Sequence, residues 1–184
     1  MCPVTAGVCL HEEESVCIHT QKHAHERTHT HAHTSVVRLN EEESYPRNKF
    51  TRRGLTHYEL EFPDCSVPGR QVVERFLAIC EQEEGAVAVH CRAGLGRTGT
   101  MIALWMMSRT WRAREAIAWL RIVRPGSVLG LQQQFLEMVE DPRRQGRLNL
   151  DITPSMLEEI LGVYDAGRCG HDTSVTVTVR LVCA

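Results

Sequence analysis

The chain has 184 residues, of which 42% are hydrophobic, and its formal net charge is −2 at neutral pH. This length is enough for one core of ordinary domain size, and the charge argues against a general nucleic-acid binder. The sequence contains no apolar run of about 18 residues, which a membrane-spanning helix would need, and no secretory signal pattern begins it. Its eight cysteines form no regular framework, so we expect a reduced protein of the cytoplasm or nucleus.

Residues 1–34 form a low-complexity lead with few apolar side chains, and we expect it to be disordered. Alternating His and Thr residues dominate its second half. An alternative interpretation is loose binding of a transition metal, which a zinc titration of a peptide covering residues 1–34 would test. The six histidines concerned are His19, His23, His25, His29, His31 and His33.

From about Ser35 onward, strand and helix patterns alternate along the chain. Strands are expected at 36–39, 55–62 and 87–89, and 173–182 also alternates like a strand but has no evident partner. Helices are expected at 45–53, 70–81, 101–107, 114–123, 132–140 and 153–161. The pattern predicts an α/β fold with a central, mostly parallel sheet flanked by helices on both faces.

The most informative stretch runs from Val87 to Thr100, where a buried strand ends in His90 and Cys91 and a glycine-rich loop leads into an apolar helix. Glycines allow the backbone N–H groups of such a loop to point inward. A ring of inward amides at the start of a helix binds anions, and phosphate fits it well. Cys91 would lie at the bottom of this bowl, where the amides and the helix dipole stabilise its thiolate.

Arg97 and Thr98 complete the predicted bowl. The planar guanidinium of Arg97 can hold two phosphate oxygens, and the Thr98 hydroxyl can donate to the thiolate. The plain alternative is a buried strand cysteine beside an ordinary turn. We predict that substrate phosphate contacts the loop residues, namely Arg92, Ala93, Gly94, Leu95, Gly96, Arg97 and Thr98.

A thiolate that attacks a phosphate ester also needs a general acid to protonate the leaving oxygen. Asp64 is our candidate, because it lies in a loop between two prolines directly after a predicted strand. The alternative is a turn aspartate that caps the next helix. An amide from Gln132, Gln133 or Gln134 could position the hydrolytic water, and the sequence does not choose among the three. His90 is expected to support the loop.

The segment from Val36 to about Met138 resembles the mitotic-exit, cell-division-cycle-fourteen subfamily of dual-specificity phosphatases. The loop alone marks the wider family of cysteine-dependent protein phosphatases, whose pattern is His-Cys, five residues, Arg and then Ser or Thr. The specific part is the run from Ile117-Ala118-Trp119 through Arg124-Pro125-Gly126-Ser127-Val128 to Gln132-Gln133-Gln134-Phe135.

This resemblance implies a phosphatase with Cys91 as nucleophile, Arg97 as phosphate binder and Asp64 as acid. It also implies phosphoserine-proline substrates of cyclin-dependent kinases, with no cofactor or metal. Cys65 departs from the family, which tends to have glycine there. The family's amino-terminal domain, which helps to shape the substrate groove, is not matched, so we expect weak selectivity among phosphopeptides.

We therefore expect residues 35–141 to form a dual-specificity phosphatase domain, with 1–34 as the lead and 142–184 as a tail of undecided structure. The partners expected are phosphorylated proteins, not nucleic acid or membrane, and the sequence does not indicate an oligomeric state. Two alternatives are a catalytically weak phosphate-binding protein and a phosphoinositide phosphatase. Leu95 in the loop favours a protein substrate over an inositol lipid, because lipid phosphatases tend to carry extra basic residues there.

Overall fold

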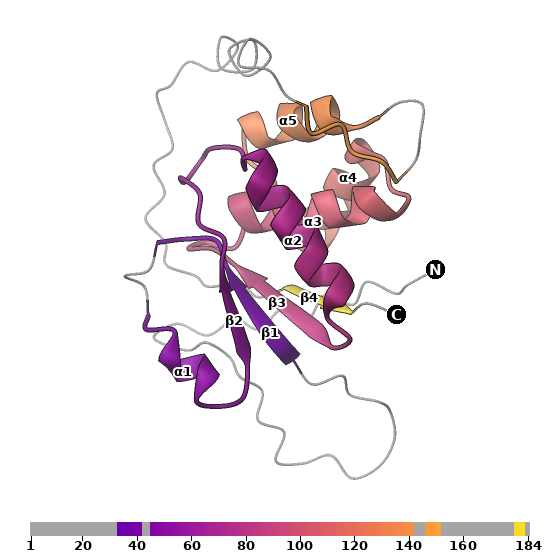
Figure 1. Cartoon of the computed structure of the whole chain (residues 1–184). Coiled ribbons are helices and arrows are strands. Elements are labelled where there is room, and N and C mark those ends of the chain that lie inside the picture. Colours follow the sequence, from indigo (N-terminus) through magenta and orange to yellow (C-terminus); the bar gives the residue numbers. More distant parts are fainter. Residues whose placement is uncertain (1–32, 42–44, 142–145, 152–178, 183–184) are drawn as a thin grey trace.

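The computed structural model of the chain describes residues 33–41, 45–141, 146–151 and 179–182 (Figure 1). The described part of the chain contains four strands and five helices. In chain order they are β1 (His33–Arg38), α1 (Asn48–Thr51), β2 (Thr56–Glu59), α2 (Arg70–Gln82), β3 (Ala86–His90), α3 (Gly96–Arg109), α4 (Ala113–Val123), α5 (Leu131–Val139) and β4 (Val179–Val182).

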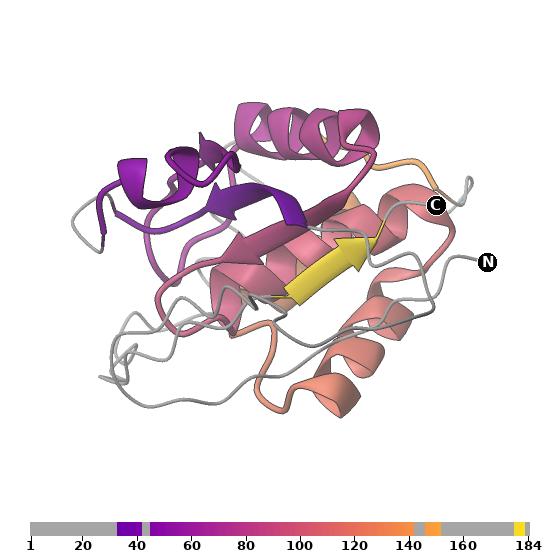
Figure 2. The ribbon, with the colours of Figure 1, turned by 90° about the horizontal axis from the view of Figure 1, so that it is seen from below.

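The strands form one sheet in the order β2-β1-β3-β4. β1 is parallel to both β2 and β3, with Val37 opposite Tyr58 on one side and Val89 on the other. β4 pairs with β3 in the antiparallel direction and is the yellow strand at the edge of the sheet in Figure 2. Because β1, β2 and β3 are parallel, their carboxyl ends meet at one edge of the sheet, where the active loops of such folds lie.

The two faces of the sheet are covered by different helices. Val37 and Val89 face the main core, which also contains Phe76 of α2 and Met101 of α3. Val36 and Ala88 point the other way and pack with Phe50 of α1 in a smaller cluster. Successive residues of a strand point to opposite faces of the sheet, so the side chains of these apolar strands are buried on both faces.

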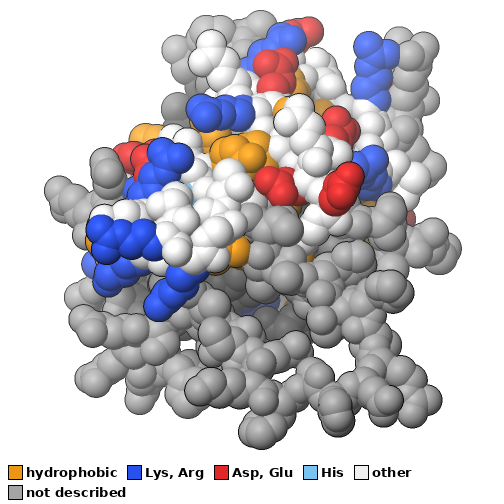
Figure 3. Space-filling model, turned by 60° about the horizontal axis from the view of Figure 1, so that its bottom comes forward, with side chains coloured by type: hydrophobic (Ala, Val, Ile, Leu, Met, Phe, Trp, Pro, Cys, Tyr) orange, Lys and Arg blue, Asp and Glu red, His pale blue; other side chains and the backbone are white. Residues whose placement is uncertain are grey.

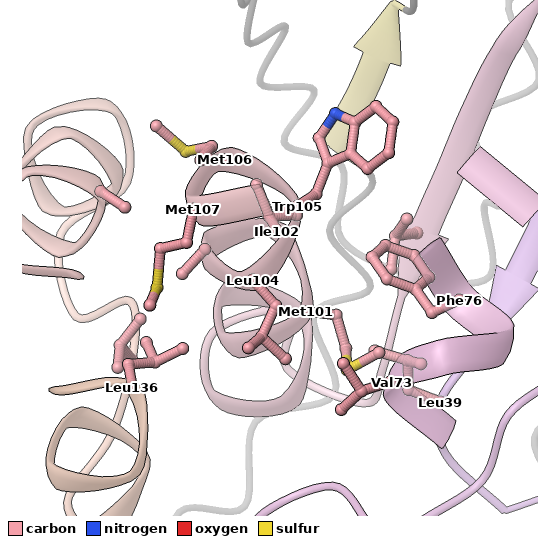
Figure 4. Packing of buried hydrophobic residues seen from close by; sticks show 14 of the residues in the cluster. Leu39, Val73, Phe76, Met101, Ile102, Leu104, Trp105, Met106, Met107 and Leu136 are labelled. Carbon is pink, nitrogen blue, oxygen red and sulfur yellow. The ribbon is translucent and has the colours of Figure 1, made fainter. Parts of the chain in front are cut away.

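α3 is the centre of the main core. Its residues from Gly96 to Met107 are all buried, because α2, α4, α5 and the sheet surround it. Figure 4 shows Met101 directed towards Val73 and Leu39, while Met107 lies on the side of Leu136. Burial of each large side chain contributes roughly 1.5–3 kcal/mol, and this packing fixes the helix whose first turn follows the predicted phosphate loop.

The structure confirms the predicted α/β fold and adjusts several element limits. β1 begins at His33, two residues before the predicted start of order near Ser35, because His33 is already in register with Ala86 of β3. The helix expected at 45–53 is restricted to Asn48–Thr51. The strand expected at 55–62 is shorter, at Thr56–Glu59.

The strand predicted at 173–182 does have a partner, which corrects the sequence interpretation. Val179–Val182 pairs with β3, and Ala86 lies opposite Val182. The sequence could not show this pairing, because the two segments are far apart in the chain. The helix expected at 153–161 and the lead before His33 lie outside the described residues.

Basic side chains gather on one side of the surface. Figure 3 shows Lys and Arg residues at the left of the lower face, where α1 lies in Figure 1. The exposed cations of α1 and its flanks are Arg47, Lys49, Arg52 and Arg53. None of the described helices has the length and apolar character needed to cross a bilayer.

Candidate active site

The site is built on β3, all five residues of which are buried. Cys91 follows directly, at the carboxyl end of this central strand, and its side chain is only 3% exposed. The Gly94 N–H donates to Cys91 Sγ at 3.2 Å, and Gly94 has a φ of 67°, which glycine adopts without strain. The Gly94 amide therefore points at the sulfur, and α3 begins directly after this loop, as in an anion site at the start of a helix.

Arg97 lies in the first turn of α3, and its side chain is 1% exposed. Its Nη1 donates to Phe62 O at 3.1 Å and to Glu41 Oε1 at 3.1 Å, with a longer bond of 3.4 Å to Leu39 O. These contacts anchor one side of the guanidinium to the ends of β1 and β2.

The Nε of Arg97 lies 3.2 Å from Asp64 Oδ1. This ion pair does not satisfy the Nε–H, which is buried without a hydrogen-bond acceptor among the described residues. A buried donor without an acceptor is costly, and a phosphate oxygen would satisfy it. The donor set of the bowl thus fits an anion.

Asp64 is brought to the bowl by a tight turn after β2. Ser66 N and Ser66 Oγ both donate to Pro63 O, at 3.3 and 2.7 Å. The Asp64 side chain is 62% exposed and pairs with Arg97, so its carboxyl stays open to a substrate. Cys65 has a φ of 57°, a conformation that glycine adopts more readily. The family's glycine would therefore fit this backbone conformation better than Cys65 does.

His90 is buried behind the bowl and is hydrogen-bonded at both ring nitrogens. Its Nδ1 lies 3.2 Å from Cys91 O, and its Nε2 contacts the Tyr45 hydroxyl. Tyr45 OH also lies 3.0 Å from Nε2 of His57. Burial lowers the pKa of His90 to about 4, and the pKa of His57 falls to about 4 for the same reason. Both rings are therefore neutral at pH 7 and support the loop.

Sequence reasoning missed the Tyr45 and His57 parts of this network. Arg38 belongs to it too, because its Nη1 donates to Tyr45 O at 2.7 Å and its Nη2 donates to Glu59 at 2.9 Å. One feature of the sequence could have indicated this network. His57 and Glu59 are two residues apart in β2, so both side chains lie on the same side of the strand. Glu41 was missed as well, because it appears in the sequence as part of an ordinary acidic run.

The structure distinguishes the three glutamines that the sequence left open. Gln132 is buried, with its Nε2 donating to Ser66 O at 3.0 Å. Gln133 instead bonds Arg121 and Glu137 on the outer side of α5, and Gln134 is exposed. Only Gln132 of the three contacts the loops of the site.

The connection between α4 and α5 supports the phosphate loop from outside. Arg124 Nη2 donates to Ala93 O at 2.9 Å. Val128 N donates to Leu95 O at 3.2 Å, and an added Cβ on Gly99 would come within 3.1 Å of Val128 N. Glycine at position 99 therefore allows α3 to approach this connection closely.

One predicted contact of the site is not formed. The Thr98 hydroxyl is buried but makes no hydrogen bond to a described residue, so the expected bond to Cys91 Sγ is absent from this structure. No group of three or more metal-ligating side chains occurs among residues 33–41, 45–141, 146–151 and 179–182.

Comparison with known proteins gives the family. A model described as PTP-SAK, "Swiss Army Knife protein, DSP-PTPase phosphatase domain", matches residues 13–136, more than half of the chain. The chain belongs to this family. Dual specificity protein phosphatase CDC14B of Mus musculus is 54% identical over 106 residues, which cover 57% of this chain and 22% of the relative. CDC14A of Homo sapiens is 55% identical over 105 residues, which cover 56% of this chain and 18% of the relative.

These relatives identify the matched part as a CDC14-type dual-specificity phosphatase catalytic domain, as the sequence predicted. The chain spans about a fifth of the length of the curated relatives it matches. Tk-PTP in its active form is 32% identical, with a TM-score of 0.51, and the match covers 60% of this chain and 79% of that chain. Kinase associated phosphatase, 17% identical with a TM-score of 0.52, has the same fold, and that match covers 56% of this chain and 66% of that chain.

Proposed function

We propose that the chain is a cysteine-dependent protein phosphatase that hydrolyses phosphoserine, phosphothreonine and phosphotyrosine esters. The observation that carries the proposal is the bowl itself. Cys91 Sγ lies at its base with the Gly94 N–H 3.2 Å away, and Arg97, whose Nε–H makes no hydrogen bond, is ion-paired with the Asp64 carboxyl. A nucleophile, an anion-binding fork and an acid are thus brought together from three segments.

The chemistry follows from these positions in two steps. The Cys91 thiolate attacks phosphorus, an S–P bond forms, and the ester P–O bond breaks while Asp64 gives its proton to the leaving oxygen. Water then attacks phosphorus, its proton passes to Asp64, and the S–P bond breaks to release inorganic phosphate and the thiolate. Arg97 and the amides from Arg92 to Thr98 hold the phosphoryl oxygens in both steps.

The substrate class is a phosphorylated protein, and we propose proline-directed kinase sites in cell-cycle control. Relatives bearing the name dual specificity protein phosphatase support this proposal. Two carboxylates, Glu41 and Asp64, lie against Arg97. They would repel the additional phosphates of an inositol lipid, which favours a phosphoprotein.

The test compares the full chain with Cys91→Ser on a generic aryl phosphate. We expect Cys91→Ser to abolish turnover, because serine is a far poorer nucleophile at neutral pH. Vanadate should still bind the variant, since the amides and Arg97 remain. Comparable turnover by the two proteins would refute the covalent mechanism.

A further inference from the structure

The Gln132 side chain is completely buried, and both ends of its amide are bonded. Its Nε2 donates to Ser66 O at 3.0 Å, and its Oε1 accepts from Leu129 N at 3.1 Å. The amide therefore joins the turn that carries Asp64 to the start of α5. Both bonds are to backbone groups, so they fix the orientation of this amide between the two segments.

The turn that carries Asp64 is fixed on both sides of that residue. Before it, Phe62 O accepts from Arg97 Nη1 at 3.1 Å. After it, Ser66 O accepts from Gln132, and the Ser66 amide and hydroxyl close the turn onto Pro63 O. Asp64 itself is largely exposed, so its position depends on these two carbonyl anchors and on its ion pair with Arg97.

The same amide also contacts the helix that follows the nucleophile. A Cβ added to Gly96 would lie 3.0 Å from Gln132 Oε1 and 3.3 Å from its Nε2. Gly96 is the first residue of α3. Gln132 therefore lies between the turn that carries the acid and the first residue of α3.

We propose that Gln132 is a positioning residue for the general acid. It holds the Pro63–Ser66 turn against the beginning of α3, so that the Asp64 carboxyl stays over the bowl. The proposal rests on the proposed phosphatase function and adds to it the residue on which acid catalysis depends. Misplacement of a reacting group by about 1 Å can cost roughly a hundredfold in rate, so removal of the contact should be visible in kinetics.

The test is the specificity constant kcat/KM of Gln132→Met on aryl phosphates with good and poor leaving groups. This constant reports the steps up to phosphorylation of Cys91, where Asp64 acts as acid. We expect a loss of about tenfold to a hundredfold on the poor leaving group and little change on the good one. In an Asp64→Asn background, the same substitution should cause no further loss. Glu137→Gln, an α5 surface change, is the matched control.

A second readout does not depend on activity. Amide hydrogen exchange of the turn should be faster at Ser66 in Gln132→Met than in the wild type and the Glu137→Gln control. The proposal is overturned if exchange in the turn is unchanged, or if the losses from Gln132→Met and Asp64→Asn simply add. A lower kcat with unchanged kcat/KM would instead assign Gln132 to water positioning. Failure of the proposed function has a different signature, which is turnover that does not depend on Cys91.

Discussion

The guanidinium of Arg97 is shared between the scaffold and the bowl. Nη1 is held by Phe62 O and Glu41, whereas Nε faces Asp64 at 3.2 Å. Asp64 therefore has two opposite effects: its proton assists the leaving group, but its charge competes with phosphate for Arg97. Substitution of this one carboxyl should separate the two effects.

We predict that Asp64→Asn slows a substrate with a poor leaving group far more than one with a good leaving group. Loss of a general acid costs about 10²- to 10⁴-fold when the leaving oxygen needs a proton. Vanadate should bind the variant at least as tightly as the wild type, because the competing charge is gone. Leaving-group series and vanadate inhibition constants measure the two effects, and equal rate losses on both substrates would count against Asp64 as the acid.

At the scale of elements, β1, β2 and β3 are connected behind the bowl by a network of side chains in which both histidines are neutral. The Tyr45 hydroxyl lies between His57 of β2 and His90 of β3, and Arg38 of β1 bonds the Tyr45 carbonyl. Burial lowers the pKa of both histidines to about 4 from an ordinary value of 6.5. Protonation of either ring would place a charge in this buried network.

We predict that the free energy of unfolding falls as the pH is lowered from 6.5 to 4. In this window the unfolded chain binds protons at the histidines that the folded chain does not, so stability decreases with decreasing pH. The expected contribution is about 1–3 kcal/mol per histidine. Urea unfolding at several pH values measures it, with His57→Gln as the comparison. A slope that is the same in the variant and the wild type would contradict a neutral, buried His57.

The elements themselves could largely be predicted, because their signals are local. The helix expected at 70–81 is α2 at Arg70–Gln82, and the apolar run before His90 is β3. β4 was harder, since its pairing with β3 depends on contacts between distant segments. The helix predicted at 45–53 was longer than α1, because Tyr45 lies outside the helix and contacts His57 and His90 instead.

For the molecule as a whole, the sequence was enough to propose the residues of the bowl, but it did not indicate the residues that support them. Cys91, Arg97 and Asp64 follow from a loop pattern and a loop aspartate, whereas Glu41 and Tyr45 contribute only through the folded arrangement of β1 and β2. Gln132 was one of three equivalent choices until burial distinguished it. Residue types in a local pattern can predict the chemistry of a site. Contacts between residues far apart in the sequence can be identified only once the fold is known.

We predict that the 184-residue chain hydrolyses small aryl phosphates but shows only weak preference among phosphopeptides. The residues of the bowl would hold the phosphoryl group, and the Pro63–Ser66 turn holds the acid. None of these residues forms a pocket for the residue that follows the phosphoamino acid. The measurement is the ratio of catalytic efficiencies on paired phosphoserine-proline and phosphoserine-alanine peptides. A large ratio would place a proline-recognising surface within this chain.

The central claim is that phosphate passes through Cys91, and acid-quench trapping tests it most directly. Wild-type protein mixed with an aryl phosphate and quenched during turnover should carry one phosphate on the peptide that contains Cys91, as measured by mass spectrometry. The account predicts this adduct in the wild type and its absence in Cys91→Ser. Turnover by the wild type without a phosphorylated Cys91, or with phosphate on another residue, would contradict it.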